Sequence, residues 1–225
     1  MTPRRIPILF AAFVFSTPCV SDAAQQVVDA RSANGLAYDL VGEGPLVVLI
    51  HGTNLDRRMW DTEAEWLREH VRVLRYDLRG QGDSDFPSDS YSNHDDLVAL
   101  LGELGARSTT LIGLSADVQV ALDVALAAPQ LVTRLVLVSP SIAGYVPAEM
   151  PAFFAELTDS LRAGDFDQAN EVLLASSLMS VPPEHAARVR AMVEDNDRRW
   201  TIPYALVEQP SQPALDRLED IAAPT

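Results

Sequence analysis

The 225-residue chain contains no lysine, so arginine supplies all 17 of its basic side chains, against 32 acidic ones. The formal net charge is −15 at pH 7. Such an acidic surface repels phosphate backbones and anionic lipid, so neither nucleic acid nor a membrane surface is a predicted partner. A phosphate-binding loop that depends on lysine is excluded as well.

Cysteine and histidine are also scarce: there is one cysteine, Cys19, and four histidines spread along the chain. A lone cysteine forms no intrachain disulfide, and no cysteine or histidine pair has the spacing of metal ligands. The sequence therefore predicts no metal site and no cofactor.

The first 23 residues have the layout of a secretory signal peptide. Arg4 and Arg5 precede an apolar run over residues 6–15, and Ser21 and Ala23 supply small residues before a cleavage site. The run is about half of the roughly 20 residues that a spanning helix needs, so no stable membrane anchor is expected. These features predict a periplasmic or secreted protein.

Three short apolar strands each run into a turn rich in small or polar residues. Leu46–Ile50 leads into His51-Gly52-Thr53-Asn54, and Arg72–Tyr76 leads into a turn over residues 77–85 with the pattern D-x-R-G-x-G-x-S. The third strand, 111–114, runs into a helix predicted for 116–128. Continuous apolar strands alternating with helices are typical of a parallel sheet with helices on both faces.

Ser115 stands at the corner between the third strand and its helix. A serine at such a corner has a strained backbone and an exposed hydroxyl, and the next amide points from the helix N-terminus toward a developing oxyanion. The full motif is G-x-S-x-G, but Asp117 replaces its last glycine. An ordinary strand-to-helix junction with a capping serine is the alternative.

Taken together and in this order, the three turns resemble those of the α/β-hydrolase family, over roughly residues 27–225. The resemblance implies an α/β fold with a mostly parallel sheet and a helical lid. It also implies that Ser115 is the nucleophile and that the backbone amides of Thr53 and Ala116 form the oxyanion hole.

The same resemblance gives His51, Gly52, Asp77 and Gly113 structural roles near the site. His51 is expected to shape the loop that presents the Thr53 amide rather than to act as the catalytic base. A dinucleotide-binding interpretation of the G-x-G in the second turn is disfavoured, because no third glycine follows at the required spacing.

Four segments are predicted: a signal peptide (1–23), a hydrolase core (24–140), a helical lid (141–213) and the start of a return to the core (214–225). The lid carries many apolar side chains. They line a substrate pocket under one hypothesis and pack only against each other under the other.

In the family the catalytic acid and histidine follow the serine, in that order. Residues 218–225 resemble the segment that leads into a seventh strand, so both groups are expected beyond Thr225 and the C-terminal strands and helix are expected to be missing. That would leave 135–138 as an apolar sheet edge. His185, in the lid, is the only histidine after Ser115, and no acid is placed to orient it.

The sequence thus predicts a serine hydrolase that acts on a small apolar carboxylic ester or lactone through an acyl-serine intermediate and is inactive or impaired as given. The alternatives are a non-catalytic remnant or small-molecule binding protein with the same fold, and an incomplete copy of a longer enzyme. The residues predict no particular oligomeric state.

Overall fold

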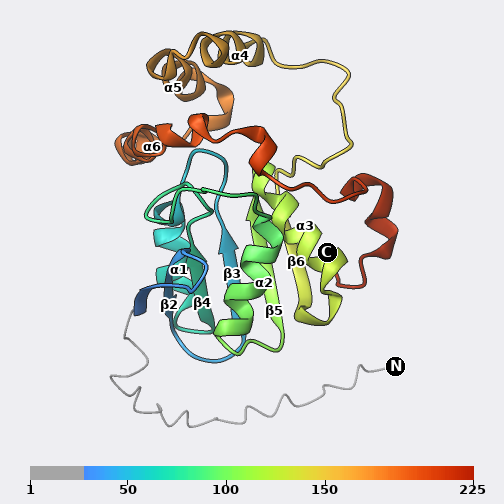
Figure 1. Ribbon diagram of the computed structural model, residues 1–225. Helices are drawn as coiled ribbons and strands as arrows, with labels where there is room; N and C mark the ends of the chain where they lie inside the picture. Colours follow the sequence, from blue (N-terminus) through green and yellow to red (C-terminus); the bar gives the residue numbers. More distant parts are fainter. Residues whose placement is uncertain (1–27) are drawn as a thin grey trace, which may run out of the picture.

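The computed structural model describes residues 28–225, so the predicted signal peptide lies outside the described residues and stays a prediction. A single six-stranded sheet forms the centre of the molecule, in the order β1-β2-β4-β3-β5-β6 (Figure 1). The strands are β1 Val28–Arg31, β2 Ala37–Val41, β3 Leu46–Ile50, β4 Arg72–Tyr76, β5 Thr109–Leu114 and β6 Val132–Val138. The helices are α1 Asp61–Leu67, α2 Asn93–Glu103, α3 Val118–Ala127, α4 Phe153–Ala163, α5 Phe166–Ala175 and α6 Pro183–Asp195.

The predicted mixed α/β sheet is confirmed. β3, β4, β5 and β6 run parallel, and β2 joins β4 and β1 in antiparallel pairs. Within this register Ile50 lies opposite Tyr76 on one side and Gly113 on the other. Because the carboxyl ends of the parallel strands meet at one edge, the turns that follow β3, β4 and β5 lie side by side.

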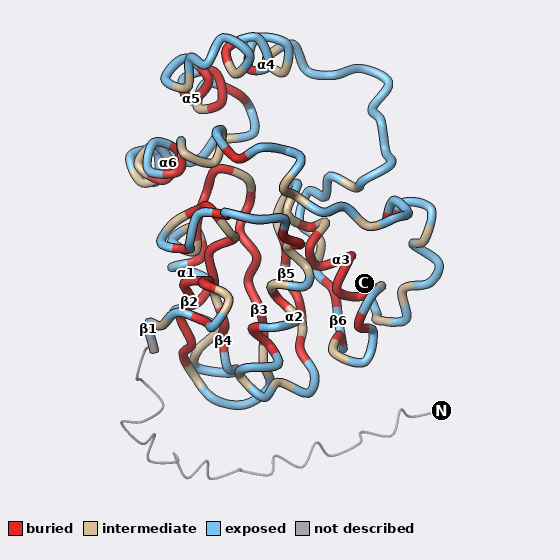
Figure 2. Tube along the Cα trace, viewed as in Figure 1, coloured by how far each residue is buried: buried red, intermediate tan, exposed pale blue. Residues whose placement is uncertain are grey.

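Both faces of the central strands are buried, which explains their continuous apolar sequence (Figure 2). Successive side chains point to opposite faces: Val48 packs in the larger core with α2 and α3, whereas Val47 packs in a second core that contains Ala64 of α1. Within residues 28–225, none of the helices combines the length and apolarity needed to cross a membrane.

Two helices of the core are preceded by a 3-10 turn. Arg57–Trp60 is a 3-10 turn that leads into α1, and the helix predicted over 116–128 opens with a 3-10 turn, Ser115–Asp117. Side-chain capping explains the first case, because the Asp56 carboxylate accepts the Arg58 amide and tightens the first turn.

Helices α4, α5 and α6 lie beyond the carboxyl ends of the parallel strands (Figure 1). Glycine and proline mark the limits of these helices, since Gly164 caps α4 in a left-handed conformation with φ of 71° and α6 starts at Pro183. The apolar side chains of these helices form two small cores. One is centred on Leu157, Ala169 and Val172, and the other joins Leu173 and Met192 to Leu55. Packing therefore accounts for most of the apolar residues of this region.

The Asn196 side chain joins the end of α6 to turns at the edge of the sheet. It is fully buried, accepts the Gly82 amide at 2.6 Å and donates to Asp56 at 2.9 Å. An ion pair of 2.8 Å between Arg58 and Asp195 lies beside it. The polar contacts therefore join α6 to the turns that follow β3 and β4.

β6 is the last strand of the sheet in the part of the chain that the structure describes. Val136 and Val138 are 44% and 37% exposed, whereas Leu135 is buried, so the predicted apolar edge is exposed at Val136 and Val138 but not at Leu135. The Leu135 amide donates to the Pro224 carbonyl oxygen at 2.9 Å, so residues near the end of the sequence cover that part of the edge.

Gly42 and Gly105 both have left-handed backbones, but only Gly42 is crowded by neighbouring atoms. Alanine substitutions at the two positions therefore distinguish the cost of a steric clash from the cost of backbone strain. At Gly42, with φ of 80°, an added Cβ would lie 2.7 Å from the Arg68 carbonyl oxygen and closer still to that of Val71. At Gly105, with φ of 66°, it would meet nothing within 4 Å. We expect Gly105→Ala to lower the free energy of unfolding by about 1 kcal/mol, the cost of the left-handed backbone.

Gly42→Ala should cost at least about 2 kcal/mol more than Gly105→Ala, because backbone oxygens cannot move aside as a side chain can. Urea denaturation of both variants gives the comparison. Equal losses would show that the chain between β2 and β3 relaxes freely.

Candidate active site

Ser115 lies at the turn between β5 and α3, as the sequence predicted. Its φ is 58°, in the left-handed region that residues other than glycine rarely adopt, and its side chain is partly exposed. Within residues 28–225 its hydroxyl group has no hydrogen-bond partner. A non-glycine residue held in this conformation stores roughly 1–3 kcal/mol of strain, and such strain clusters at functional sites.

Close packing explains the glycines around the turn. A Cβ on Gly113 would lie 3.1 Å from Val118 Cα, so any side chain here would push α3 away from β5 by a few tenths of an ångström. In the turn after β3 a Cβ on Gly52 would lie 3.2 Å from the Leu114 side chain. Both residues keep the two turns in contact, in line with their predicted structural roles.

The Thr53 turn lies directly beside the serine turn. The Thr53 hydroxyl donates to the Asp117 carboxylate at 3.4 Å, a long hydrogen bond that joins the loop after β3 to the start of α3. Asn54 has φ of 60°, and its amide donates to the Gln81 side chain at 3.0 Å. The structure thus brings the Thr53 and Ala116 segments together, and the use of their amides as an oxyanion hole stays a prediction.

His51 uses both ring nitrogens inside the protein and is fully buried. Its Nε2 accepts the Leu78 amide at 2.9 Å, and its Nδ1 lies 2.9 Å from the Gly52 carbonyl oxygen. The hydrogen-bond pattern assigns the proton to Nδ1 and makes the imidazole neutral. A ring with both nitrogens engaged cannot take a proton from Ser115, which supports the predicted structural role.

Asp77 is a buried carboxylate that joins the turns after β3 and β4. It accepts the backbone amides of Arg57 at 2.7 Å and Asp83 at 2.9 Å, and it forms a short ion pair with the Arg57 side chain. Burial raises the pKa of Asp77, although Arg57 and the two amides oppose this effect. These contacts support the structural role predicted for Asp77.

Asp117 introduces a carboxylate beside the candidate oxyanion site. Burial raises the pKa of Asp117, while the Arg199 guanidinium and the Thr53 hydroxyl act in the opposite direction. His51 contributes little here, because its hydrogen bonds keep it neutral. A carboxylate at this place opposes the negative charge that forms on a carbonyl oxygen during acyl transfer.

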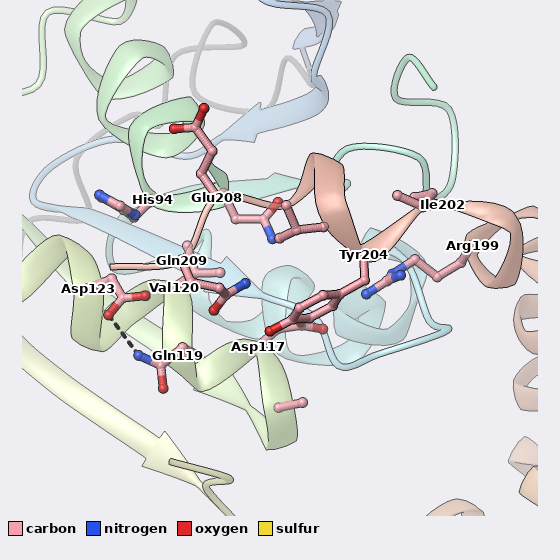
Figure 3. Close-up of a pocket in the computed structure, with 13 residues that line it drawn as sticks. His94, Asp117, Gln119, Val120, Asp123, Arg199, Ile202, Tyr204, Glu208 and Gln209 are labelled. Atoms are coloured by element: carbon pink, nitrogen blue, oxygen red, sulfur yellow. Dashed lines mark hydrogen bonds between the residues drawn. The ribbon is translucent and has the colours of Figure 1, made fainter. Parts of the chain in front are cut away.

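A cleft of about 240 Å³ opens beside the serine turn (Figure 3). Ala116 and Asp117 line its near side, but neither Ser115 nor Thr53 contributes to the lining. The remaining wall is mostly polar and comes from α2, α3 and the segment after α6; it includes Asn93, His94, Gln119, Asp123, Arg199 and Tyr204.

Similarity to known proteins shows to which family the chain belongs. A model of the alpha/beta hydrolase family matches residues 47–225. The chain belongs to this family. A crystal structure of a hydrolase from Pseudomonas aeruginosa PA01 is 31% identical, with a TM-score of 0.62, over 79% of this chain and 70% of that one. A thermophilic esterase from Thermogutta terrifontis is 25% identical, with a TM-score of 0.69, over 89% and 78%.

Curated relatives match shorter parts of this alpha/beta hydrolase. An uncharacterized protein from Mycobacterium tuberculosis is 34% identical over 125 residues, which are 53% of this chain and 37% of that protein. A pimeloyl-[acyl-carrier protein] methyl ester esterase from Methylococcus capsulatus is 38% identical over 103 residues, 46% of this chain and 40% of the esterase. The matches thus span less than half the length of these two relatives.

No histidine within residues 28–225 hydrogen-bonds to Ser115. His94 is the second residue of α2, where its ring lies 2.8 Å from the Ser92 hydroxyl group, and His185 is exposed near the start of α6. Across the described ranges no group of three histidine, cysteine or acidic side chains could hold a metal ion. The described residues thus bring together a serine and candidate oxyanion donors without a hydrogen-bonded base.

The sequence predicted the serine turn but not the polar wall of the cleft. The available signal in the sequence was Asp123, an acidic residue within the apolar run of α3. The structure shows that this side chain is only 8% exposed. Arg199 and Tyr204 follow α6, some 80 residues later in the chain, and no local pattern marks them.

Asp117 yields a prediction about stability and pH. Because its pKa is raised in the folded state, folding takes up a proton between the ordinary and the raised value, so this residue lowers stability as pH rises through that window. Asp117→Asn removes the effect. Relative to the parent protein, we expect the variant to gain stability from pH 4 to pH 7, by about 1.4 kcal/mol for each pH unit between the ordinary and the raised pKa of Asp117.

The measurement is urea denaturation of both proteins at pH 4, 5.5 and 7. Asp159→Asn is the matched control, because this carboxylate on α4 is exposed. A stability difference for Asp117→Asn that stays constant with pH would contradict the prediction.

Proposed function

We propose that the protein is a serine hydrolase that acts on a carboxylic ester or a lactone through an acyl-Ser115 intermediate. The observation that carries the proposal is the strained left-handed backbone of Ser115, at a strand-to-helix turn held against the Thr53 loop. Family membership and the names of relatives support the substrate class. Besides the two esterases, a structure of an N-acyl homoserine lactone degrading enzyme is 25% identical, with a TM-score of 0.67, over 88% of this chain and 78% of that one.

The proposed chemistry proceeds in two steps. The Ser115 oxygen attacks the carbonyl carbon and loses its proton, the bond to the leaving oxygen breaks, and the alcohol departs with a proton. Water then attacks the acyl-serine and releases the acid. The Thr53 and Ala116 amides would donate to the oxyanion in both steps, and one such donor is worth about 3 kcal/mol.

This mechanism needs a group that takes the serine proton, and no described residue forms a hydrogen bond that would serve this purpose. Loss of the triad typically leaves only about 10³- to 10⁴-fold acceleration over water. We therefore propose that the 225-residue chain hydrolyses activated esters slowly.

A non-catalytic small-molecule binding protein with the same fold is the second candidate. Asp117 favours it, because this carboxylate stands where the family motif has glycine and opposes an oxyanion. Under this proposal the cleft beside Ala116 holds a ligand without chemical change.

External imidazole can replace an absent base and so tests the proposed function. We expect the protein to hydrolyse p-nitrophenyl acetate slowly. After the rate of the protein-free reaction is subtracted, 100 mM imidazole should raise the rate by at least about 10-fold, since a positioned base accelerates such reactions by about 10²- to 10⁴-fold. Ser115→Ala should change the slow rate little but remove the acceleration.

Ser141→Ala serves as the control, because it removes an exposed hydroxyl group from a residue whose amide donates to the Ser115 carbonyl oxygen at 3.1 Å. That variant should keep the response to imidazole. Equal acceleration in the protein and in Ser115→Ala would exclude Ser115 as the nucleophile and leave the binding protein as the better proposal.

A further inference from the structure

We propose that the Asp123 end of the cleft binds the ammonium group of an amine-bearing substrate whose ester or lactone carbonyl lies at Ser115. The position of the carbonyl rests on the proposed function, whereas the ammonium site rests on the cleft alone. The sequence suggested an apolar substrate, but the cleft that adjoins the serine turn has a polar wall.

The cleft has two chemically different ends (Figure 3). Asp117, Arg199 and Tyr204 lie together at the end next to the serine turn. Asp123, Gln119 and His94 lie together at the other end. A ligand that fills the cleft therefore meets a different set of groups at each end.

Gln119 fixes the orientation of the Asp123 carboxylate. Its amide nitrogen donates to Asp123 Oδ1 at 2.7 Å, while its own oxygen accepts the Ala143 amide at 2.9 Å. With both ends of the Gln119 amide engaged, the side chain cannot turn over to offer Asp123 a second donor. Asp123 is 8% exposed and faces the cleft from α3.

One oxygen of the Asp123 carboxylate lacks a hydrogen-bond donor. Within residues 28–225, Asp123 Oδ2 accepts no hydrogen bond. An unpaired acceptor in a partly closed site is costly, and a ligand with an N–H group would satisfy it. An ammonium group brings three donors and a charge opposite to that of the carboxylate.

Two neighbouring groups act on the Asp123 carboxylate but do not close the site. His94 and Arg217 both act on Asp123 electrostatically, but neither forms an ion pair with it. Burial raises the pKa of Asp123, so a carboxylate here is still under-compensated. The overall charge of −15 also favours the approach of cations.

Helix geometry gives the spacing between the two groups. Asp123 follows Ser115 by eight residues along the 3-10 turn and α3, which corresponds to about 12 Å at a rise of 1.5 Å per residue. Contacts of about 3 Å at each end leave about 6 Å between the carbonyl carbon and the nitrogen. A 6-aminohexanoyl ester is a suitable test compound.

Binding is tested first, without turnover, by following amide chemical shifts as butylammonium is added at pH 8. We expect saturable shifts in α3 and at Asn93, with binding at least about 10-fold weaker in Asp123→Asn and unchanged in Asp159→Asn. Butan-1-ol and butyrate, added to the unaltered protein, distinguish the contribution of the ligand's positive charge from that of its alkyl group. Equal binding of butan-1-ol, preferred binding of butyrate through Arg199, or no saturable shift would each overturn the proposal.

Turnover is tested second, with imidazole present. The ratio of kcat/KM for p-nitrophenyl 6-aminohexanoate over p-nitrophenyl hexanoate should be about 10 in the protein and fall to about 1 in Asp123→Asn. A ratio of 1 in both proteins overturns the link between the ammonium site and Ser115. Failure of both esters to react counts against the proposed function, while the butylammonium titration still decides the ammonium site.

Discussion

The parallel pairing of β3 with β5 is the constraint on which the candidate site depends. Ile50 lies opposite Gly113, so the chain leaves both strands at the same level and the Thr53 and Ser115 turns come into contact. Glycine at 52 and 113 permits that contact without strain, since a Cβ at either place would force its neighbour to shift by a few tenths of an ångström. The strained backbone of Ser115 is then held by packing on both sides.

Buried polar side chains connect these turns to α6 through hydrogen bonds. His51 ties the turn after β3 to that after β4, and Asn196 ties Gly82 of the latter turn to α6. Each of these side chains has its hydrogen bonds satisfied inside the protein, and these bonds fix the positions of the turns relative to each other. Helix α6 and the Arg199 segment after it are therefore positioned by the same polar network that shapes the serine turn.

Electrostatics distinguishes this site from one built only for oxyanion stabilisation. Asp117 brings negative charge to the start of α3, and Asp123 repeats it farther along the same helix. Their carboxylates lie in a cleft to which Arg199 is the one arginine that residues 28–225 contribute, so the site as a whole favours a ligand that carries donors or positive charge. The two proposals thus share one physical basis, a serine turn beside an acceptor-rich cleft.

The sequence alone determined the strands, the serine corner and the family, because apolar runs, small turn residues and their order are local signals that Leu46–Ile50 and the Ser115 turn express directly. It left open whether the apolar residues of 141–213 form a pocket, and it gave no sign of the polar wall of the cleft. Only the tertiary structure decided these points, since Asp123 and Arg199 line the same cleft although 76 positions separate them in the chain. Contacts of this kind depend on how whole elements pack, and no periodicity within one element encodes them.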